Sequence, residues 1–405
     1  QIQFGVVQGT MACSRVIFSV ALVGMLAWCA HASLPDVGKD MADIVSEKGY
    51  PIEEYHVVTA DNYTLGMFRI PYGRGQEPPT TRRPAVILQH GLEDSSYTWV
   101  NNFPTESLGF LLADAGYDVW LPNSRGNYYS TPPNPSDSFW AFTWDEMAKY
   151  DLPANVDFVL QATGLSTVSY VGHSQGTTQA FAGFSLDAEL QSKVNFFGAL
   201  APVAYVDHEK SLLLRILADL DAVVLFELLG VRDFLPDASL LQKLAPGLCS
   251  LIPWGCEDFL FLIVGPSHNL NETRIPVYVS ETPAGTSTMN IAHWCQGVKV
   301  DKFQMYDYGC GLFSCDNIKH YGQKTPPAYD LSKVTVPTAL YAGTEDDLAD
   351  LTDVQTLIDQ LPDSTVVHHD TIQGFAHLDF TWGKDANTLV YADLMKRIAQ
   401  YASTA

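Results

Sequence analysis

The sequence has few charged residues, and most of those it has are acidic. Charged side chains make up 17% of the 405 residues, and 23 Lys and Arg stand against 46 Asp and Glu, which gives a formal net charge of −23. Binding to phosphate backbones or to anionic membranes through charge requires clustered Lys and Arg. The shortage of basic residues therefore excludes nucleic acid as a partner. The acidity is typical of a secreted protein and also fits an acidic working compartment.

The sequence also lacks long apolar runs, internal repeats and metal-binding spacings. The N-terminal apolar stretch of 13 residues is too short for a membrane span, and no later run reaches the roughly 18 residues that a span requires. The nearest, Leu212 to Val231, carries four charges and predicts an amphipathic helix. No Cys-x-x-Cys or His-Glu-x-x-His spacing occurs, so we expect no zinc site. The 47% of hydrophobic residues exclude a disordered, coiled-coil or collagen-like chain.

The N-terminus is typical of a secretory signal peptide. Residues 1–10 precede the first methionine, Met11, and Arg15 then supplies a positive charge before the apolar stretch Val16 to Trp28. Ala30-His31-Ala32 is a small-x-small cleavage site before Ser33. We therefore predict that residues 1–32 are upstream and signal sequence. The protein is expected to enter the secretory pathway, with an extracellular (gut lumen) or lysosomal destination.

Two glycosylation sequons and the cysteines fit that route. The sequons are Asn62-Tyr63-Thr64 and Asn271-Glu272-Thr273, which makes Asn62 and Asn271 candidate acceptors. Outside the signal the cysteines are Cys249, Cys256, Cys295, Cys310 and Cys315. An odd count leaves at least one outside any intramolecular pair. The two short loops make Cys249–Cys256 and Cys310–Cys315 the simplest disulfide pairing, with Cys295 left over.

Short apolar runs alternate with helical stretches along the chain. Tyr55 to Pro71 predicts a hairpin that turns at Asp61-Asn62. The further predicted strands are Ala85 to Gln89, Val119 to Pro122, Val168 to Gly172, Phe196 to Ala201, Thr338 to Ala342 and Val366 to Asp370. Uniformly apolar strands between helices predict an α/β fold with a mostly parallel sheet buried on both faces. Residues 205–329 break this rhythm, so we expect a core of 33–204 and 330–405 with 205–329 inserted.

One motif predicts a nucleophile. Gly172-His173-Ser174-Gln175-Gly176 matches Gly-x-Ser-x-Gly and lies between an apolar strand and the helical stretch Thr177 to Leu186. The glycines allow a turn so tight that the serine hydroxyl stands exposed above the sheet. The same letters occur in ordinary glycine-rich turns, but the strand–turn–helix context favours a catalytic Ser174.

A serine hydroxyl needs a base and a carboxylate that orients the base. In proteins with a serine at such a strand–turn–helix position, the acid and then the histidine follow the serine along the chain. His377 follows the last predicted strand, whereas His368 and His369 lie inside it, and His90 lies far upstream. The acid is expected after the preceding strand. Four carboxylates compete there, and position alone does not choose among them: Glu345, Asp346, Asp347 and Asp350.

The tetrahedral intermediate of acyl transfer needs backbone N–H donors. One is expected from the residue after the nucleophile, Gln175. The other is expected from the loop after the strand that ends at His90-Gly91, which makes Leu92 the candidate.

At these residues the sequence resembles the acid lipases, the family of gastric and lysosomal acid lipase. The resemblance covers nearly the whole chain after the signal. It is carried by Leu88-Gln89-His90-Gly91-Leu92, Leu121-Pro122-Asn123-Ser124-Arg125-Gly126-Asn127, Phe139-Trp140-Ala141-Phe142, the stretch from Asp145 to Pro153, Gly172-His173-Ser174-Gln175-Gly176, Pro283-Ala284-Gly285-Thr286-Ser287 and His377-Leu378-Asp379-Phe380.

The resemblance implies an α/β-hydrolase fold with an inserted helical cap. It implies Ser174 as nucleophile, His377 as base, and Leu92 and Gln175 as oxyanion donors, and it selects Asp346 as the acid. It also implies a mobile lid near Pro236 to Val264 and a cap disulfide similar to Cys249–Cys256. Cys310, Cys315 and Cys295 depart from the family pattern.

We therefore expect a serine lipase that hydrolyses carboxylic esters of lipids, triacylglycerols or sterol esters, through an acyl-enzyme. No metal or organic cofactor is expected. The substrate would be met at an oil–water or membrane–lipid interface, by a monomer. One alternative is an esterase for small soluble esters, or a serine peptidase. Another is a lipase-like lipid-binding protein without catalysis. The apolar run Phe259 to Val264 favours a lipid substrate, although it would equally suit the core of the cap.

Overall fold

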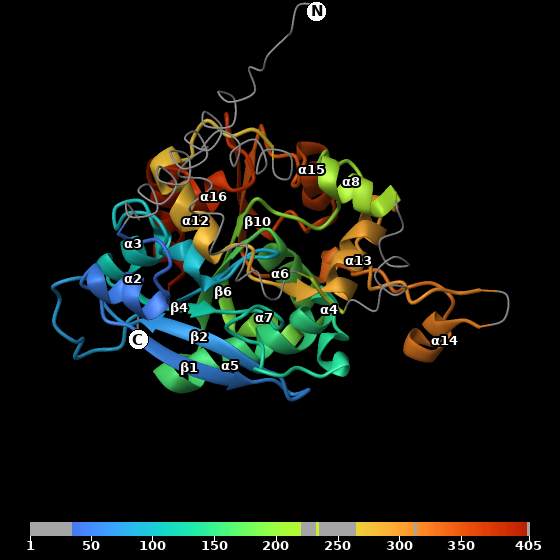
Figure 1. Cartoon of the computed structure of the whole chain (residues 1–405), viewed down its shortest axis with the longest axis horizontal. Coiled ribbons are helices and arrows are strands. Elements are labelled where there is room, and N and C mark those ends of the chain that lie inside the picture. The colour runs from blue at the N-terminus through green and yellow to red at the C-terminus, as the bar shows by residue number, and fades with distance from the viewer. Residues whose placement is uncertain (1–34, 220–231, 235–264, 312–313, 403–405) are drawn as a thin grey trace, which may run out of the picture.

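A central sheet of eight strands organises the computed structural model (Figure 1). The structure describes residues 35–219, 232–234, 265–311 and 314–402. The strands are β1 (Glu53–Val58), β2 (Thr64–Ile70), β3 (Ala85–Gln89), β4 (Asp118–Pro122), β5 (Val168–His173), β6 (Val194–Leu200), β9 (Thr338–Gly343) and β10 (Val366–Ile372).

The strand order is β1-β2-β4-β3-β5-β6-β9-β10. Strand β2 pairs antiparallel with both of its neighbours, and every pair from β4 to β10 is parallel. Every residue of β3, β4, β5 and β9 is buried, as the uniformly apolar runs predict. The prediction of a mostly parallel sheet is therefore confirmed.

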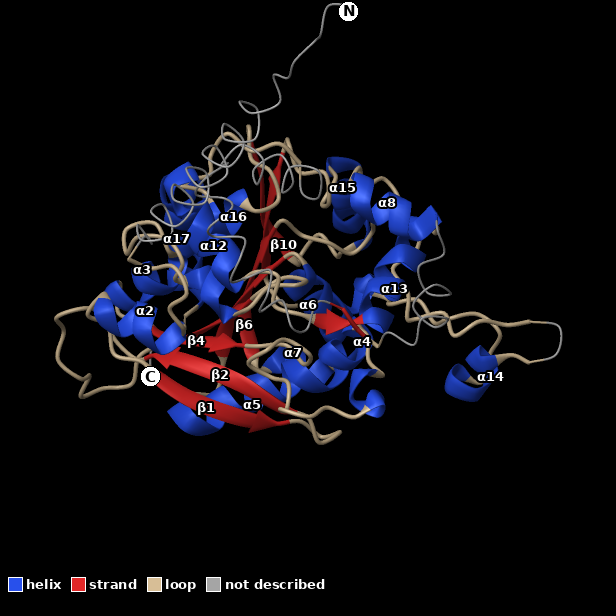
Figure 2. Cartoon of the chain, in the orientation of Figure 1, coloured by secondary structure: helices blue, strands red, loops and turns tan. Residues whose placement is uncertain are grey.

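Helices flank the sheet, as Figure 2 shows. Helix α3 packs on β2 and β4, α5 on β1, β3 and β5, α6 on β5, and α17 on β6. The α-helices are α2 (Met41–Glu47), α3 (Leu108–Asp114), α4 (Trp144–Glu146), α5 (Leu152–Thr163), α6 (Gln175–Leu186), α7 (Ala188–Ser192), α8 (Leu212–Asp219), α12 (Ile275–Glu281), α13 (Thr288–Val298), α14 (Asp316–Tyr321), α15 (Leu351–Gln360), α16 (Asp379–Trp382) and α17 (Ala392–Tyr401).

The hairpin of β1 and β2 turns where the sequence predicts, with Asn62 in the left-handed region at φ 67°. Arg125 fixes this turn to the core. Its buried guanidinium forms ion pairs with Asp61 at 2.7 Å and with Asp151 at 2.6 Å, and it lies 3.9 Å from the ring centre of Tyr63. The hairpin and the loop after β4 are thereby held as one unit.

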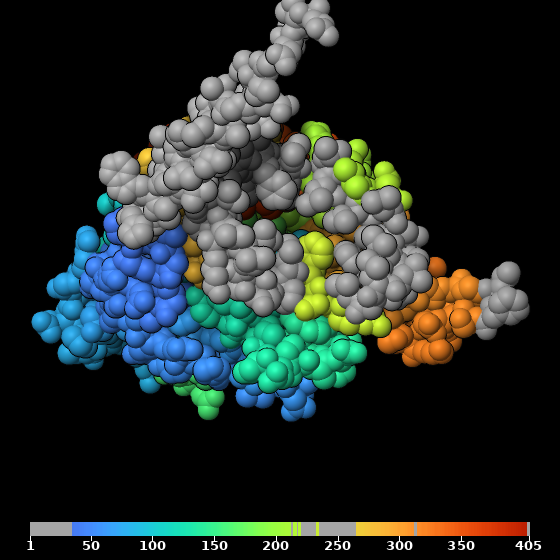
Figure 3. Space-filling model, viewed as in Figure 1, coloured from blue at the N-terminus to red at the C-terminus, as the bar shows by residue number. Residues whose placement is uncertain are grey.

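Between β6 and β9 the chain leaves the sheet and forms α8, α12, α13, α14 and the two-stranded sheet of β7 (Asp233–Phe234) and β8 (Thr286–Ser287). The helix predicted from Leu212 is present as far as Asp219. Residues around α14, in orange, lie on the opposite side of the face in Figure 3 from the blue N-terminal residues. The expected signal, the lid Pro236 to Val264, the run Phe259 to Val264 and the pair Cys249–Cys256 lie outside the described residues.

The residues on either side of the undescribed part of this insertion contact loops at the carboxyl edge of the sheet. Lys210 donates its backbone N–H to the carbonyl of Asp347 at 2.6 Å, and its ammonium lies 2.7 Å from Asp350. Where the described chain resumes, a Cβ on Gly265 would lie 2.4 Å from the carbonyl oxygen of Glu345, so this approach is possible only for glycine. Ser267 donates a hydrogen bond to Asp379.

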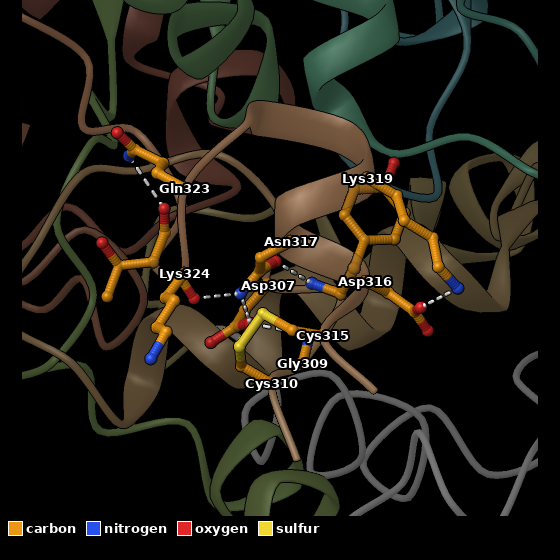
Figure 4. The surroundings of a disulfide bond; sticks show 11 residues. Asp307, Gly309, Cys310, Cys315, Asp316, Asn317, Lys319, Gln323 and Lys324 are labelled. Atoms are coloured by element: carbon orange, nitrogen blue, oxygen red, sulfur yellow. Dashed lines mark hydrogen bonds and ion pairs between the residues drawn. A yellow bond between two sulfur atoms is a disulfide. The ribbon is translucent and has the colours of Figure 1, made fainter. Parts of the chain in front are cut away.

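Cys310 and Cys315 form a disulfide bond at the base of α14 (Figure 4). Next to it, the side-chain amide of Asn317 donates to Asp307 at 2.7 Å and to the carbonyl of Lys324 at 2.9 Å, which closes the same loop a second time. Cys295 is buried on α13.

The two sequons lie in turns near the surface. Asn62 is exposed, whereas Asn271 is half-buried and its side-chain oxygen accepts hydrogen bonds from both the N–H and the hydroxyl of Thr273. Among the described residues, no helix combines the length and apolar character needed to cross a bilayer.

Candidate active site

Ser174 occupies a strained turn between β5 and α6. Its backbone has φ 54° and ψ −122°, a conformation that residues other than glycine rarely adopt. A Cβ on Gly172 would lie 2.7 Å from the backbone of Gly176, and a Cβ on Gly176 would lie 2.6 Å from the carbonyl oxygen of Gln89. Both positions therefore require glycine, as the motif predicts.

Three side chains distant in sequence form a chain of hydrogen bonds. The Oγ of Ser174 lies 2.7 Å from Nε2 of His377, and Nδ1 of His377 lies 2.9 Å and 3.0 Å from the two carboxyl oxygens of Asp346. All three residues are buried, with exposed fractions of 8% for Ser174, 3% for His377 and 4% for Asp346. A carboxylate on Nδ1 keeps the proton there and leaves Nε2 free to accept the serine proton.

The structure separates the four acids after β9. Only Asp346 contacts His377; its Oδ1 also accepts the backbone N–H groups of Leu348 and Ala349 at 2.9 and 2.8 Å, which fix the carboxyl group. Asp350 caps α15 by accepting from the N–H of Thr352 and pairs with Lys210. Glu345 is exposed.

The loop that carries His377 is held from two sides. The imidazole of His173 donates from Nε2 to the carbonyl of His377 at 2.9 Å. Asp379 accepts the N–H of Ala376 at 2.8 Å as well as the hydroxyl of Ser267. Burial lowers the pKa of His173 to about 3 and raises the pKa of Asp379 to about 6. A neutral His173 is the state that can donate without placing a second charge beside His377.

The other histidines after Ser174 lie elsewhere. His208 pairs with Asp353, His268 is exposed, His293 stacks on Trp144, His320 stacks on Tyr308, and His368 and His369 lie on β10.

The loop after β3 lies directly against the nucleophile. A Cβ on Gly91 would lie 3.0 Å from the Cβ of Ser174. His90 does not act on Ser174: its Nδ1 donates to the carbonyl of Gly91 at 2.8 Å, and its Nε2 accepts the N–H of Ser124 at 3.0 Å. Burial lowers the pKa of His90 to about 4, which keeps it neutral. Because the carbonyl of Gly91 and the N–H of Leu92 belong to one peptide unit, His90 fixes the orientation of both.

On the other side of Ser174, Gln175 is the first residue of the twelve-residue helix α6. The first N–H groups of a helix have no partner within it and carry its partial positive charge. The backbone N–H of Gln175 is therefore placed beside Ser174, at the positive end of α6, where a developing oxyanion would be stabilised.

Two acids follow Leu92 directly, of which Asp94 is buried and Glu93 is partly buried. The backbone carbonyl of Glu93 accepts the N–H of Ala284 at 2.8 Å, and its Oε2 accepts the N–H of Gly285 at 3.3 Å. Its Oε1 is buried and has no hydrogen-bond partner. Burial raises the pKa of Glu93 to about 8 and that of Asp94 to about 7. Glu93 also has a positive φ of 56°.

One group among the described residues has the spacing of a metal site, Asp207, His208 and Asp353. The Nδ1 of His208 lies 2.8 Å from Asp353 and 3.2 Å from Asp207. The imidazole thus lies within ion-pair distance of both carboxylates, and this interaction explains why the three residues lie together.

The sheet, the serine on a strand–helix elbow and the linked histidine and aspartate define an α/β-hydrolase. Two family descriptions match the sequence: "Partial alpha/beta-hydrolase lipase region" over residues 41–103 and "alpha/beta hydrolase fold" over residues 84–224. Among solved structures, a monoglyceride lipase from Saccharomyces cerevisiae superimposes with a TM-score of 0.55 at 15% identity, covering 88% of this chain and 96% of that one. A putative lipase from Sulfolobus solfataricus gives a TM-score of 0.53 at 14% identity, covering 86% and 99%.

Closer relatives define the family. Gastric triacylglycerol lipase of Homo sapiens is 44% identical over 380 residues, which cover 91% of this chain and 93% of that protein. Lysosomal acid lipase/cholesteryl ester hydrolase of Homo sapiens is 43% identical over 403 residues, covering 96% and 100%. Lipase member K of Homo sapiens is 43% identical over 376 residues, covering 91% and 92%. The chain belongs to the acid lipase family and is an ester hydrolase.

Some residues that build the site were not predicted from the sequence. His173 and the pair Glu93 and Asp94 stand beside predicted residues, but nothing in a single sequence shows that they are buried. Asn290 and Trp294 of α13 contact Gln175 from far along the chain. Their spacing of four residues places them on one helix face, which is the one available signal.

Proposed function

We propose that this chain is a serine lipase that hydrolyses carboxylic esters of lipids, with triacylglycerols and sterol esters as its substrate class. The observation that carries the proposal is the hydrogen-bonded chain of Ser174, His377 and Asp346 in a member of this family. The names of the relatives, a gastric triacylglycerol lipase and a lysosomal acid lipase/cholesteryl ester hydrolase, support the substrate class.

In the proposed reaction, His377 accepts the proton of Ser174 through Nε2 while the serine Oγ attacks the ester carbonyl. Asp346 holds the imidazole and stabilises the imidazolium that forms. The carbonyl oxygen becomes an oxyanion, which the N–H groups of Leu92 and Gln175 stabilise. Protonated His377 then gives its proton to the leaving alcohol, and the acyl group stays on Ser174. Water, activated by His377 in the same way, releases the fatty acid.

The names of the relatives and the raised carboxyl pKa values support a proposal about the working compartment. We propose that the protein is secreted or lysosomal; two of its relatives are named as a gastric and a lysosomal lipase. Burial raises the pKa of several carboxyl groups to between about 6 and 8, including Glu93, Asp94, Asp145 and Glu281. Such groups are neutral, and free of a buried charge, at mildly acidic pH.

The test compares substrates on purified protein. Emulsified long-chain triacylglycerol, cholesteryl oleate and soluble p-nitrophenyl butyrate are assayed between pH 4 and pH 8, with Ser174→Ala as the control. Ser174→Ala is expected to lose about 10⁶-fold in turnover, as in other triad hydrolases. Cleavage of the butyrate alone would assign the chain as an esterase for soluble esters. Activity that survives in Ser174→Ala would overturn the assignment of the nucleophile.

A further inference from the structure

Helix α13, in the insertion between β6 and β9, holds the side chain of the residue next to the nucleophile. The Oε1 of Gln175 accepts two hydrogen bonds from this helix, one from the side-chain amide of Asn290 at 2.8 Å and one from the indole N–H of Trp294 at 2.7 Å. The Nε2 of Gln175 lies 3.5 Å from the sulfur of Met147. Both polar ends of this side chain are therefore engaged.

The three side chains that form these hydrogen bonds are buried. Gln175, Asn290 and Trp294 have exposed fractions of 2%, 0% and 7%. Inside the protein, water cannot replace a lost hydrogen-bond partner. Removing either of the two donors to Oε1 therefore raises the free energy of the folded state. The side chain of Gln175 thus has one strongly preferred position.

Asn290 is itself fixed in place. Its amide also donates to the hydroxyl of Thr286 at 3.1 Å, and its backbone N–H donates to the hydroxyl of Ser287, which caps α13. Ser287 in turn donates to the carbonyl of Phe142 in the core. The N-terminal end of α13 is thereby anchored to the core at Phe142.

The peptide unit between Ser174 and Gln175 is held at its carbonyl end: the carbonyl of Ser174 accepts the N–H groups of Thr177 at 2.8 Å and Thr178 at 3.3 Å and the hydroxyl of Thr177 at 2.7 Å. The N–H of Gln175, at the other end of this unit, has no partner within α6, so the hydrogen bonds to the Gln175 side chain are a second constraint on its direction. A small rotation of this peptide unit would turn the N–H away from the ester oxygen, and oxyanion donors act only when their direction is fixed in advance.

We propose that Asn290 and Trp294 are positioning residues for catalysis, which hold the side chain of Gln175 so that its backbone N–H keeps its direction toward the oxyanion. This inference rests on the proposed function, in which Gln175 is an oxyanion donor. It extends the catalytic machinery to a helix that contributes no group to the reaction itself.

The test is a double-mutant cycle on the full-length protein. Trp294→Phe removes the indole N–H and keeps an aromatic ring, and Gln175→Ala removes the acceptor while leaving the backbone N–H in place. We expect Trp294→Phe to lower kcat about 10-fold with little change in KM, since loss of a whole oxyanion donor costs about 10²–10³-fold. In the Gln175→Ala background, Trp294→Phe should cause no further loss of kcat, because the side chain through which Trp294 acts is absent.

Two measurements separate positioning from general stability. Affinity for an alkylboronic acid, whose oxygen mimics the oxyanion, should weaken in Trp294→Phe in parallel with kcat. Gln296→Ala is the matched control: it lies on the same helix and loses hydrogen bonds at 2.9 and 2.8 Å, but to Asp307. It should lower the melting temperature and leave kcat and boronate affinity unchanged.

An equal loss of kcat from Trp294→Phe in both backgrounds, or no loss in the wild-type background, would overturn the inference. Should Trp294→Phe unfold, Asn290→Leu replaces it in the same cycle with the same expectations. Failure of the proposed function would look different: Ser174→Ala would then keep the wild-type rate, whatever Trp294→Phe did.

Discussion

A Cβ atom on Gly91 would lie 3.0 Å from the Cβ of Ser174, which is at the limit of contact between two such atoms. The loop after β3 and the turn that carries Ser174 are thus packed against each other through a position that has no side chain. Gly91 and Ser174 come from the ends of neighbouring strands, β3 and β5, so the parallel sheet sets their spacing.

This contact predicts the effect of Gly91→Ala. The added methyl group must displace either Ser174 or the peptide unit that carries the N–H of Leu92 by a few tenths of an ångström. Because a 1 Å displacement can cost about 10²-fold, we expect kcat to fall about 10-fold with the fold retained. Gly311→Ala is the control, since among the described residues a Cβ there would meet only the carbonyl of Ser314 at 3.6 Å. Full activity in Gly91→Ala would show that the loop can move freely.

The choice of acid is tested by Asp346→Asn. The amide would favour the wrong tautomer of His377, with the proton on Nε2, and turnover should fall about 10⁴-fold. Asp347→Asn and Asp350→Asn are the matched controls and should retain most activity, since neither contacts His377. Asparagine at 350 can still cap α15. If Asp347→Asn were the inactive variant, the acid would be misassigned by one residue.

The pH dependence of stability follows from Glu93. Its ordinary pKa is 4.5, and burial raises the pKa to about 8 in the folded state. Between these values the folded protein keeps a proton that the unfolded chain releases. The free energy of unfolding therefore decreases as pH rises from about 4.5 to about 8, by up to about 1.4 kcal/mol per pH unit for one such group.

Below about pH 6.5 the lowered pKa values of the buried His90 and His173 act against Glu93, because the unfolded chain binds protons there that the folded protein does not. We accordingly expect the melting temperature to fall between about pH 6.5 and pH 8. Asp94 and Glu281 have pKa values raised by burial to about 7 and act in the same direction. Glu93→Gln, which is neutral at every pH, should reduce this slope measurably in thermal melts. Glu77→Gln, in the exposed loop between β2 and β3, changes the charge equally and should leave the slope unchanged. Identical slopes in wild type and Glu93→Gln would contradict a carboxyl group of Glu93 that stays neutral in the folded protein.

The disulfide at α14 is predicted to be local in effect. Cys310 and Cys315 are separated by five positions, so their bond closes a short loop, worth about 2 kcal/mol on chain-entropy grounds. Replacing both with Ser should make the chain near α14 more sensitive to limited proteolysis. Esterase activity on p-nitrophenyl butyrate should not change. A large loss of activity would mean that this loop supports the catalytic centre.

Much of the fold could be read from the sequence because the parallel strands are buried on both faces. The run Ala85 to Gln89 is strand β3 as predicted, and the helix after Ser174 differs from its prediction only at its first turn, where Gln175 and Gly176 already belong to α6. Strand β10 extends two residues beyond its predicted end, because pairing with β9 continues to Ile372 although the apolar pattern stops earlier.

The site was less accessible to sequence reasoning for a physical reason. Residue position placed four acids after β9, but their different burial and partners arise only when the loop meets His377 and Lys210. The same holds for Asn290 and Trp294, whose role depends on which face of α13 packs on α6. More than a hundred positions separate Gln175 from Asn290 and Trp294 along the chain, and local sequence patterns do not reveal contacts over such distances.

The ties between the insertion and the catalytic loops determine how related chains could be recombined. A chimera that exchanged residues 205–329 as one block would remove Lys210, Ser267 and the two α13 residues together. Crossover points placed after Asp219 and before Gly265 would keep all of them with the sheet. Exchanging only the stretch between those points would leave the loops that carry Asp346 and His377, and the side chain of Gln175, with their native neighbours.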